Sequence, residues 1–75
     1  MGRPITGQDT LDIAHYVDDP ELLERLHGRD DALTPEDWIL ALVDELGDVC
    51  AVATAHRVSR DLADAVVELI VSDRR

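Results

Sequence analysis

The carboxyl-terminal third of the chain most constrains its fold, because residues 49–72 contain neither glycine nor proline. Aliphatic side chains recur there at intervals of three and four residues, the spacing that places them on one face of an α-helix. They are Ala51, Ala55, Val58, Leu62, Ala65, Val66 and Leu69, and the opposite side carries Arg57, Asp61, Asp64 and Glu68. We therefore expect an amphipathic helix that buries its aliphatic side.

Two interpretations of this segment remain open. In the first, residues 49–72 form one long helix, which the absence of helix breakers favours. In the second, a turn at residues 56–58 divides the segment, and Ser59 caps a further helix because serine is a favoured N-cap residue. The predicted fold is all-α in either case: a small bundle of four helices with a long C-terminal amphipathic helix, or of five helices.

Proline marks the start of two of the remaining helices. A residue that precedes proline is driven out of helical conformation, so Asp19 fits the N-cap of a helix over residues 20–27, which Gly28 closes. Thr34 fits the same position before a helix that runs to Leu46. The core face of this third helix is spaced i, i+3, i+4 and i+7 and consists of Ile39, Leu42, Val43 and Leu46.

The amino-terminal segment is expected to combine a leader with a first short helix. Pro4 and two glycines lie within residues 1–8, which we predict to be a flexible leader. The helix covers residues 10–17 with Asp9 as its cap. Residues 9–75 then form a single acidic helical domain.

The size of the chain favours self-association. With 75 residues and a single cysteine, the chain has no internal disulfide to support its core. A core of this size supplies only about 3–5 kcal/mol on its own, so a small domain benefits from forming a dimer. A stripe of small residues would let a second helix approach closely, so we expect this half of the chain to form either the core or the self-association surface of a homodimer. The stripe consists of Ala51, Ala55, Ala63 and Ala65.

Charge is distributed unevenly along the chain. Residues 1–48 contain 13 acidic residues and three arginines, a net charge of −10, whereas residues 49–75 contain four of each and are neutral. High net charge keeps small domains soluble, and a one-sided distribution also fits a surface that meets a basic partner. Arginine without lysine is typical of a GC-rich bacterium or its phage.

The third helix carries the residues that we predict to bind a partner protein. Leu40 lies off the core face, between Glu36 and Asp44 on the helical wheel, and Trp38 flanks that face. Tryptophan is enriched at interface hot spots, and packing within the core is the alternative for Trp38. The predicted partner-binding set is Glu36, Asp37, Trp38, Leu40, Asp44 and Glu45.

One motif follows the third helix: Gly47-Asp48-Val49-Cys50-Ala51-Val52-Ala53, then Val58-Ser59-Arg60. It resembles the helix-turn-helix of the factor-for-inversion type. The resemblance implies a DNA-binding regulator that contacts DNA through Arg57, Ser59 and Arg60. Arg57 occupies the position of the family's turn glycine, and a chain of net charge −10 gains little from the counterion release that drives DNA binding.

The sequence indicates no catalytic residues, no cofactor and no metal site. The histidines and the cysteine lack the short paired spacing of zinc ligands, and adjacent carboxylates on a helix point to different sides. The histidines and the cysteine in question are His15, His27, Cys50 and His56. Cys50 stands among small apolar residues, so we expect a packed thiol. No apolar run approaches the ~20 residues of a membrane span, and a cytoplasmic location is expected.

The sequence thus favours a non-enzymatic, acidic protein-interaction module, an adaptor or inhibitor, that binds a basic partner protein through its acidic amino-terminal half and self-associates. The first alternative is a helix-turn-helix DNA-binding regulator. The second is a DNA mimic, whose carboxylates imitate phosphates and inhibit a nucleic-acid-binding protein.

Overall fold

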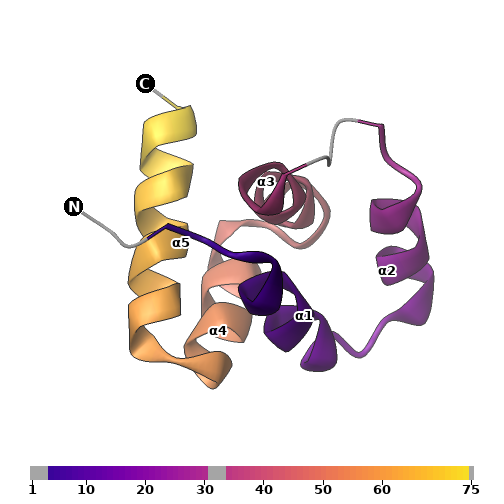
Figure 1. Cartoon of the computed structure of the whole chain (residues 1–75), viewed down its shortest axis with the longest axis horizontal. Coiled ribbons are helices and arrows are strands. Elements are labelled where there is room, and N and C mark those ends of the chain that lie inside the picture. The colour runs from indigo at the N-terminus through magenta and orange to yellow at the C-terminus, as the bar shows by residue number, and fades with distance from the viewer. Residues whose placement is uncertain (1–3, 31–33, 75) are drawn as a thin grey trace.

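The computed structural model describes residues 4–30 and 34–74, and over these ranges the chain forms five α-helices and no strand. The helices are α1 (Gly7–His15), α2 (Pro20–His27), α3 (Pro35–Leu46), α4 (Asp48–Val58) and α5 (Arg60–Asp73). The predicted all-α fold is confirmed. Helix α3 contacts all four other helices, and Figure 1 shows it between α2 on one side and the α4–α5 pair on the other.

The two predicted proline-marked helix starts are confirmed. The Asp19 side chain accepts a hydrogen bond from the backbone N–H of Leu22 (3.1 Å) at the start of α2. The Thr34 hydroxyl oxygen accepts one from the backbone N–H of Asp37 (3.1 Å) at the start of α3. Each bond satisfies a donor that a helix terminus leaves without an intrahelical partner, which is why these boundaries could be located from local sequence.

The predicted start of the first helix was wrong. Helix α1 begins at Gly7 rather than at residue 10, and its N-cap is Thr6 rather than Asp9. Thr6 and Asp9 form a reciprocal capping box: the Thr6 N–H donates to Asp9 Oδ2 (2.9 Å) and the Asp9 N–H donates to Thr6 Oγ1 (3.3 Å). Ile5, which falls within the predicted leader, is buried in the core. Residues 1–3 of the predicted leader lie outside the described residues.

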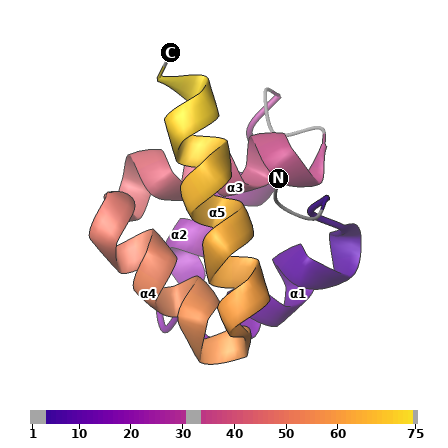
Figure 2. The same cartoon turned by 90° about the vertical axis from the view of Figure 1, so that its left-hand side faces the viewer.

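The carboxyl-terminal segment is two helices, as in the second interpretation. Helix α4 ends at Val58, and Ser59 has extended backbone angles (φ −163°, ψ 155°). The Ser59 hydroxyl oxygen accepts a hydrogen bond from the Leu62 N–H (3.0 Å) and so caps α5. The break turns α5 back along α4, and the two helices lie side by side (Figures 1 and 2).

The small-residue stripe serves this intramolecular packing. Its four alanines are all buried within the chain, at 0–4% exposure: Ala51, Ala55, Ala63 and Ala65. Of the two roles expected for this half of the chain, the burial of these alanines fits the core. Small buried side chains let helices pack closely against their neighbours, and α4 and α5 are the most extensively packed pair in the fold.

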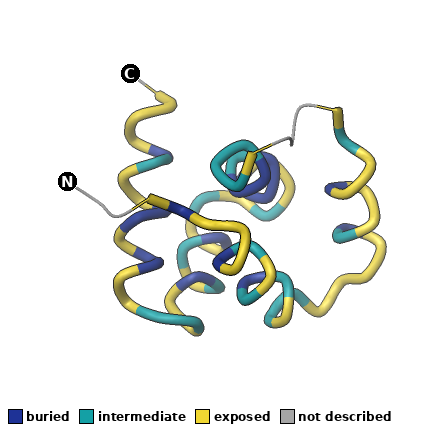
Figure 3. Tube along the Cα trace, viewed as in Figure 1, coloured by how far each residue is buried: buried dark blue, intermediate teal, exposed yellow. Residues whose placement is uncertain are grey.

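The core lies on the inner faces of all five helices (Figure 3). Leu62 and Val66 of α5 are almost fully buried, and Leu69 packs against the core with part of its surface exposed. The expectation that the carboxyl-terminal third buries its aliphatic side is confirmed. The largest fully buried side chains are Ile13, Leu22, Leu26, Ile39, Leu42, Leu62 and Val66.

Candidate functional site

Helix α3 positions most of the predicted partner-binding residues on its outer face. The Thr34 cap and Pro35 fix the first turn, in which Glu36 and Asp37 are both half-buried. Acidic side chains in a first helical turn also interact favourably with the positive end of the helix dipole, so these two residues stabilise the helix whether or not they bind a partner.

Trp38 is buried, with 8% of its surface exposed, and it belongs to the hydrophobic core. Because α3 is enclosed by four other helices, it buries a wider face than the expected i, i+3, i+4, i+7 stripe. The buried residues of α3 are Trp38, Ile39, Ala41, Leu42 and Val43. The structure therefore places Trp38 among the core residues and apart from the five other members of the predicted partner-binding set.

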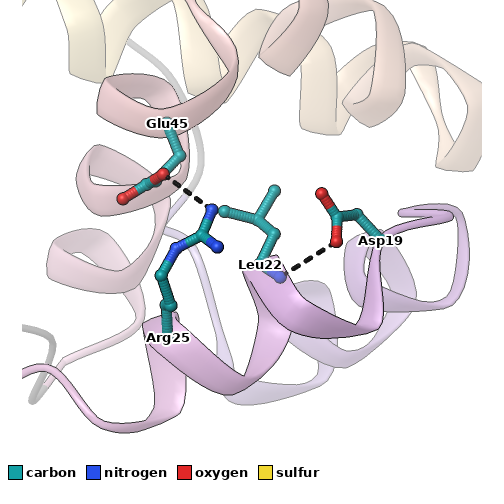
Figure 4. Close-up of polar contacts among 4 residues, drawn as sticks. All are labelled: Asp19, Leu22, Arg25 and Glu45. Carbon is teal, nitrogen blue, oxygen red and sulfur yellow. Dashed lines mark hydrogen bonds and ion pairs between the residues drawn. The ribbon is translucent and has the colours of Figure 1, made fainter.

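The two acids at the end of α3 connect this helix to α2. The Arg25 guanidinium donates a hydrogen bond to Glu45 Oε2 at 3.2 Å, as Figure 4 shows, and Arg29 Nη2 lies 3.9 Å from Asp44 Oδ2. These side chains remain 30–73% exposed, and surface ion pairs of this kind contribute between zero and about 1 kcal/mol. The arginines offset the negative charge at this end of α3.

Glu36, Leu40 and Asp44 form a single stripe along α3. Their i, i+4, i+8 spacing stacks them on one side of the helix, with half-buried Leu40 between two acids. Within residues 4–30 and 34–74, Glu36 and Asp37 form no ion pair. The uncompensated negative charge of α3 is therefore concentrated near its amino terminus. We call the group of Glu36, Asp37, Leu40, Asp44 and Glu45 the acidic face.

The residues of the DNA-binding alternative lie around the α4–α5 junction. The guanidinium carbon of Arg57 lies 5.0 Å from the ring centroid of Tyr16, so Arg57 makes a cation–π contact with the end of α1. Arg60 is exposed in the first turn of α5. Helix α4 continues through Arg57, and Ser59 alone connects α4 to α5. A helix-turn-helix has a turn of about three to four residues at this point, so the connection differs from the one that the resemblance implies.

Cys50 is exposed, which corrects the expectation of a packed thiol. Helix α4 turns Ala51 and Ala55 to the core, and Cys50 lies on another side of the helix. Across the described residues, no three or more His, Cys, Asp or Glu side chains come together as a metal site. No helix in the same ranges is both long and apolar enough to cross a membrane.

Sequence reasoning missed an apolar surface on the outside of α4 and α5. Val49 is 82% exposed, and Val67 and Val71 are 43% and 48% exposed. Two adjoining hollows run over this surface and share Asp48 and Val52. The available signal was the position of these valines on the helical wheel, because all three lie off the aliphatic stripe that defines the core.

Comparisons with models of protein families, with curated proteins and with solved structures found no match for this chain. The geometry of the acidic face, the α4–α5 junction and the outer α4–α5 surface is therefore the basis for the function proposed below.

Proposed function

We propose that this protein is a non-enzymatic interaction module, an adaptor or inhibitor, that binds a partner protein with a basic surface through the acidic face of α3. The observation that carries the proposal is the stripe of Glu36, Leu40 and Asp44, in which a half-buried leucine lies between two carboxylates. Leucine offers an apolar anchor, and the flanking acids select lysine or arginine on the partner.

The distribution of charge supports the same proposal. The net charge of −10 arises within residues 1–48, so the acidic face belongs to the half of the chain that would attract a basic protein at long range. Arg25 and Arg29 pair with the acids at the end of α3, which leaves Glu36 and Asp37 as the acids most ready to accept a new cationic partner. Trp38 supports the surface from the core and is not part of the contact.

The proposal is tested by affinity capture from nuclease-treated extract of the native host, followed by binding measurements with the captured protein. The variant E36Q/D37N removes two charges from the acidic face, and L40S removes its apolar anchor. The control D61N/D64N removes two exposed charges from α5 instead. We expect E36Q/D37N to weaken binding about tenfold at low salt, the effect of losing two exposed ion pairs of about 0.7 kcal/mol each.

Capture that is equally strong with the wild-type chain, E36Q/D37N and L40S would contradict the proposal. Displacement of the captured protein by DNA would favour the DNA mimic instead. A mobility shift of DNA by the chain itself, lost in R57A/R60A, would favour the helix-turn-helix regulator, because those arginines would then contact phosphates.

A further inference from the structure

We infer that a second copy of this chain docks on the outer surface of α4 and α5, with the two α4 helices antiparallel across a two-fold axis near Val52. This inference does not depend on the proposed function of the acidic face. It rests on the exposed valines of α4 and α5 and on the order of polar residues along α4.

The apolar part of this surface is continuous across both helices. One hollow is lined by Val49, Val52 and Ala53, together with Asp48 and His56. The adjoining hollow is lined by Val52, Val67, Ile70 and Val71, together with Asp48 and Arg74. Val49 is 82% exposed, the highest fraction among the large hydrophobic side chains of the described residues. Exposed apolar side chains that adjoin in this way are typical of a protein–protein contact.

The order of hydrogen-bonding residues on α4 explains why a second copy fits this surface. Asp48, Val52 and His56 are spaced i, i+4, i+8, so an acid, a valine and a histidine follow one another along one side of the helix. A two-fold axis at Val52 reverses this order in the partner. Asp48 of each copy then lies opposite His56 of the other, and the pattern complements itself twice, as an isologous interface requires.

The Asp48 carboxylate has the capacity for this additional contact. Both of its oxygens already pair with the Arg74 guanidinium: Oδ1 accepts a hydrogen bond from Nη2 at 2.7 Å, and Oδ2 forms an ion pair with Nη1. An ionised carboxylate has about four acceptor sites, so an imidazole N–H from the second copy can be accommodated beside the arginine. Ala53 lies next to the proposed axis, and its small side chain lets the two helices approach closely.

The size of the surface indicates a weak dimer. A standard interface buries about 800 Å² on each partner. The whole chain exposes 4872 Å², so such an interface would cover roughly one sixth of it, whereas nine residues line the two hollows, against about 20–30 on each side of a standard interface. We therefore expect a dimer that dissociates on dilution, while the monomer retains its own core.

Sedimentation equilibrium over a range of chain concentrations tests the surface. V49D places a charge at the most exposed apolar position. A two-fold interface contains this residue from each copy, so the substitution introduces two charges. Two buried, unpaired carboxylates at about 1.4 kcal/mol each weaken the dimer about 100-fold. The control is L11D on α1, which makes a comparable change at another exposed apolar side chain, 64% exposed. Circular dichroism checks that both variants keep their helices.

A second pair of variants tests the antiparallel alignment. H56D would set a carboxylate against Asp48 of the other copy, and we expect the dimer to weaken at least tenfold. H27D is the matched control, because His27 is also exposed in the last turn of its helix. The swapped variant D48H/H56D restores the opposed pairs and should recover dimerisation relative to H56D.

Four results would overturn the inference. A wild-type chain that is still monomeric at ~1 mM has no self-association of useful strength. Dimerisation that is unchanged in V49D would exclude the surface, and an equal loss in L11D would show that the effect is not confined to α4 and α5. Dimerisation that is equal in H56D and H27D would exclude the antiparallel alignment.

Discussion

The substitution Ala55→Leu tests whether α4 packs closely on the core through its buried alanines. Ala55 is fully buried at 0% exposure, between α4 and the rest of the core. Leucine adds three carbon atoms at a position with no room for them. Ala53→Leu is the control, because it makes the same chemical change two residues away, on the exposed side of the same helix.

Overpacking a filled core destabilises a protein by about 1–3 kcal/mol, because side chains leave their preferred rotamers and the backbone shifts. A chain of this size has only about 3–5 kcal/mol available from its core, so A55L should lose about half of its free energy of unfolding. The Ala53→Leu change occurs at the surface and should alter that free energy by no more than about 0.5 kcal/mol.

Urea unfolding followed by circular dichroism measures both variants, at a chain concentration low enough for monomers. With a slope of about 1 kcal/mol per molar urea, the midpoint of A55L should fall by about 1–3 M while that of A53L hardly moves. The smaller substitution A55C should lie between A55L and the wild-type chain. Equal midpoints for A55L and A53L would refute the close packing of α4 on the core.

Substitutions at three further features of the fold are tested by the same unfolding assay. Gly47→Ala should destabilise the chain by about 1–3 kcal/mol, because Gly47 has φ 88° and ψ 160°, a conformation open essentially to glycine alone, although a methyl group there would meet no neighbour within 4 Å. Ser59→Ala should remove the cap of α5 and about 0.5–2 kcal/mol, whereas Ser59→Asn should retain most of that stability. A double-mutant cycle on Arg25→Ala and Glu45→Ala should give a coupling below about 1 kcal/mol, since both side chains are partly exposed to solvent; a larger value would mean that the ion pair holds α2 on α3.

Helix boundaries set by local chemistry could be predicted from the sequence. Asp19 and Thr34 each precede a proline. An extended N-cap followed by a helical proline is one of the few conformations that suit both the capping residue and the proline after it. The start of α1 could not be chosen in this way, because Thr6 and Asp9 are both good capping residues. The burial of Ile5 accompanies the earlier start, and burial depends on the packing of distant segments.

The break at Ser59 and the position of Trp38 depend on tertiary packing. Serine fits both a helix interior and an N-cap, so the sequence of residues 49–72 is compatible with one helix or two. The packing of α5 against α4 decides between them. Trp38 flanks the predicted core face, and only the enclosure of α3 by four helices brings its side chain inside. The acidic residues of α3 all retain exposed surface, which the sequence predicts because ionised side chains remain near water at almost any helix position.

The junctions at Gly47 and Ser59 make the segment from α3 to α5 sensitive to inserted residues. Each junction is a single residue between two helices, so there is no loop that could accommodate an inserted residue. A residue inserted into the first turn of α5 would rotate everything after it by about 100° about the helix axis. Leu62 and Val66 would then leave the core and charged neighbours would enter it. Length variation among relatives of this chain should accordingly fall outside these junctions.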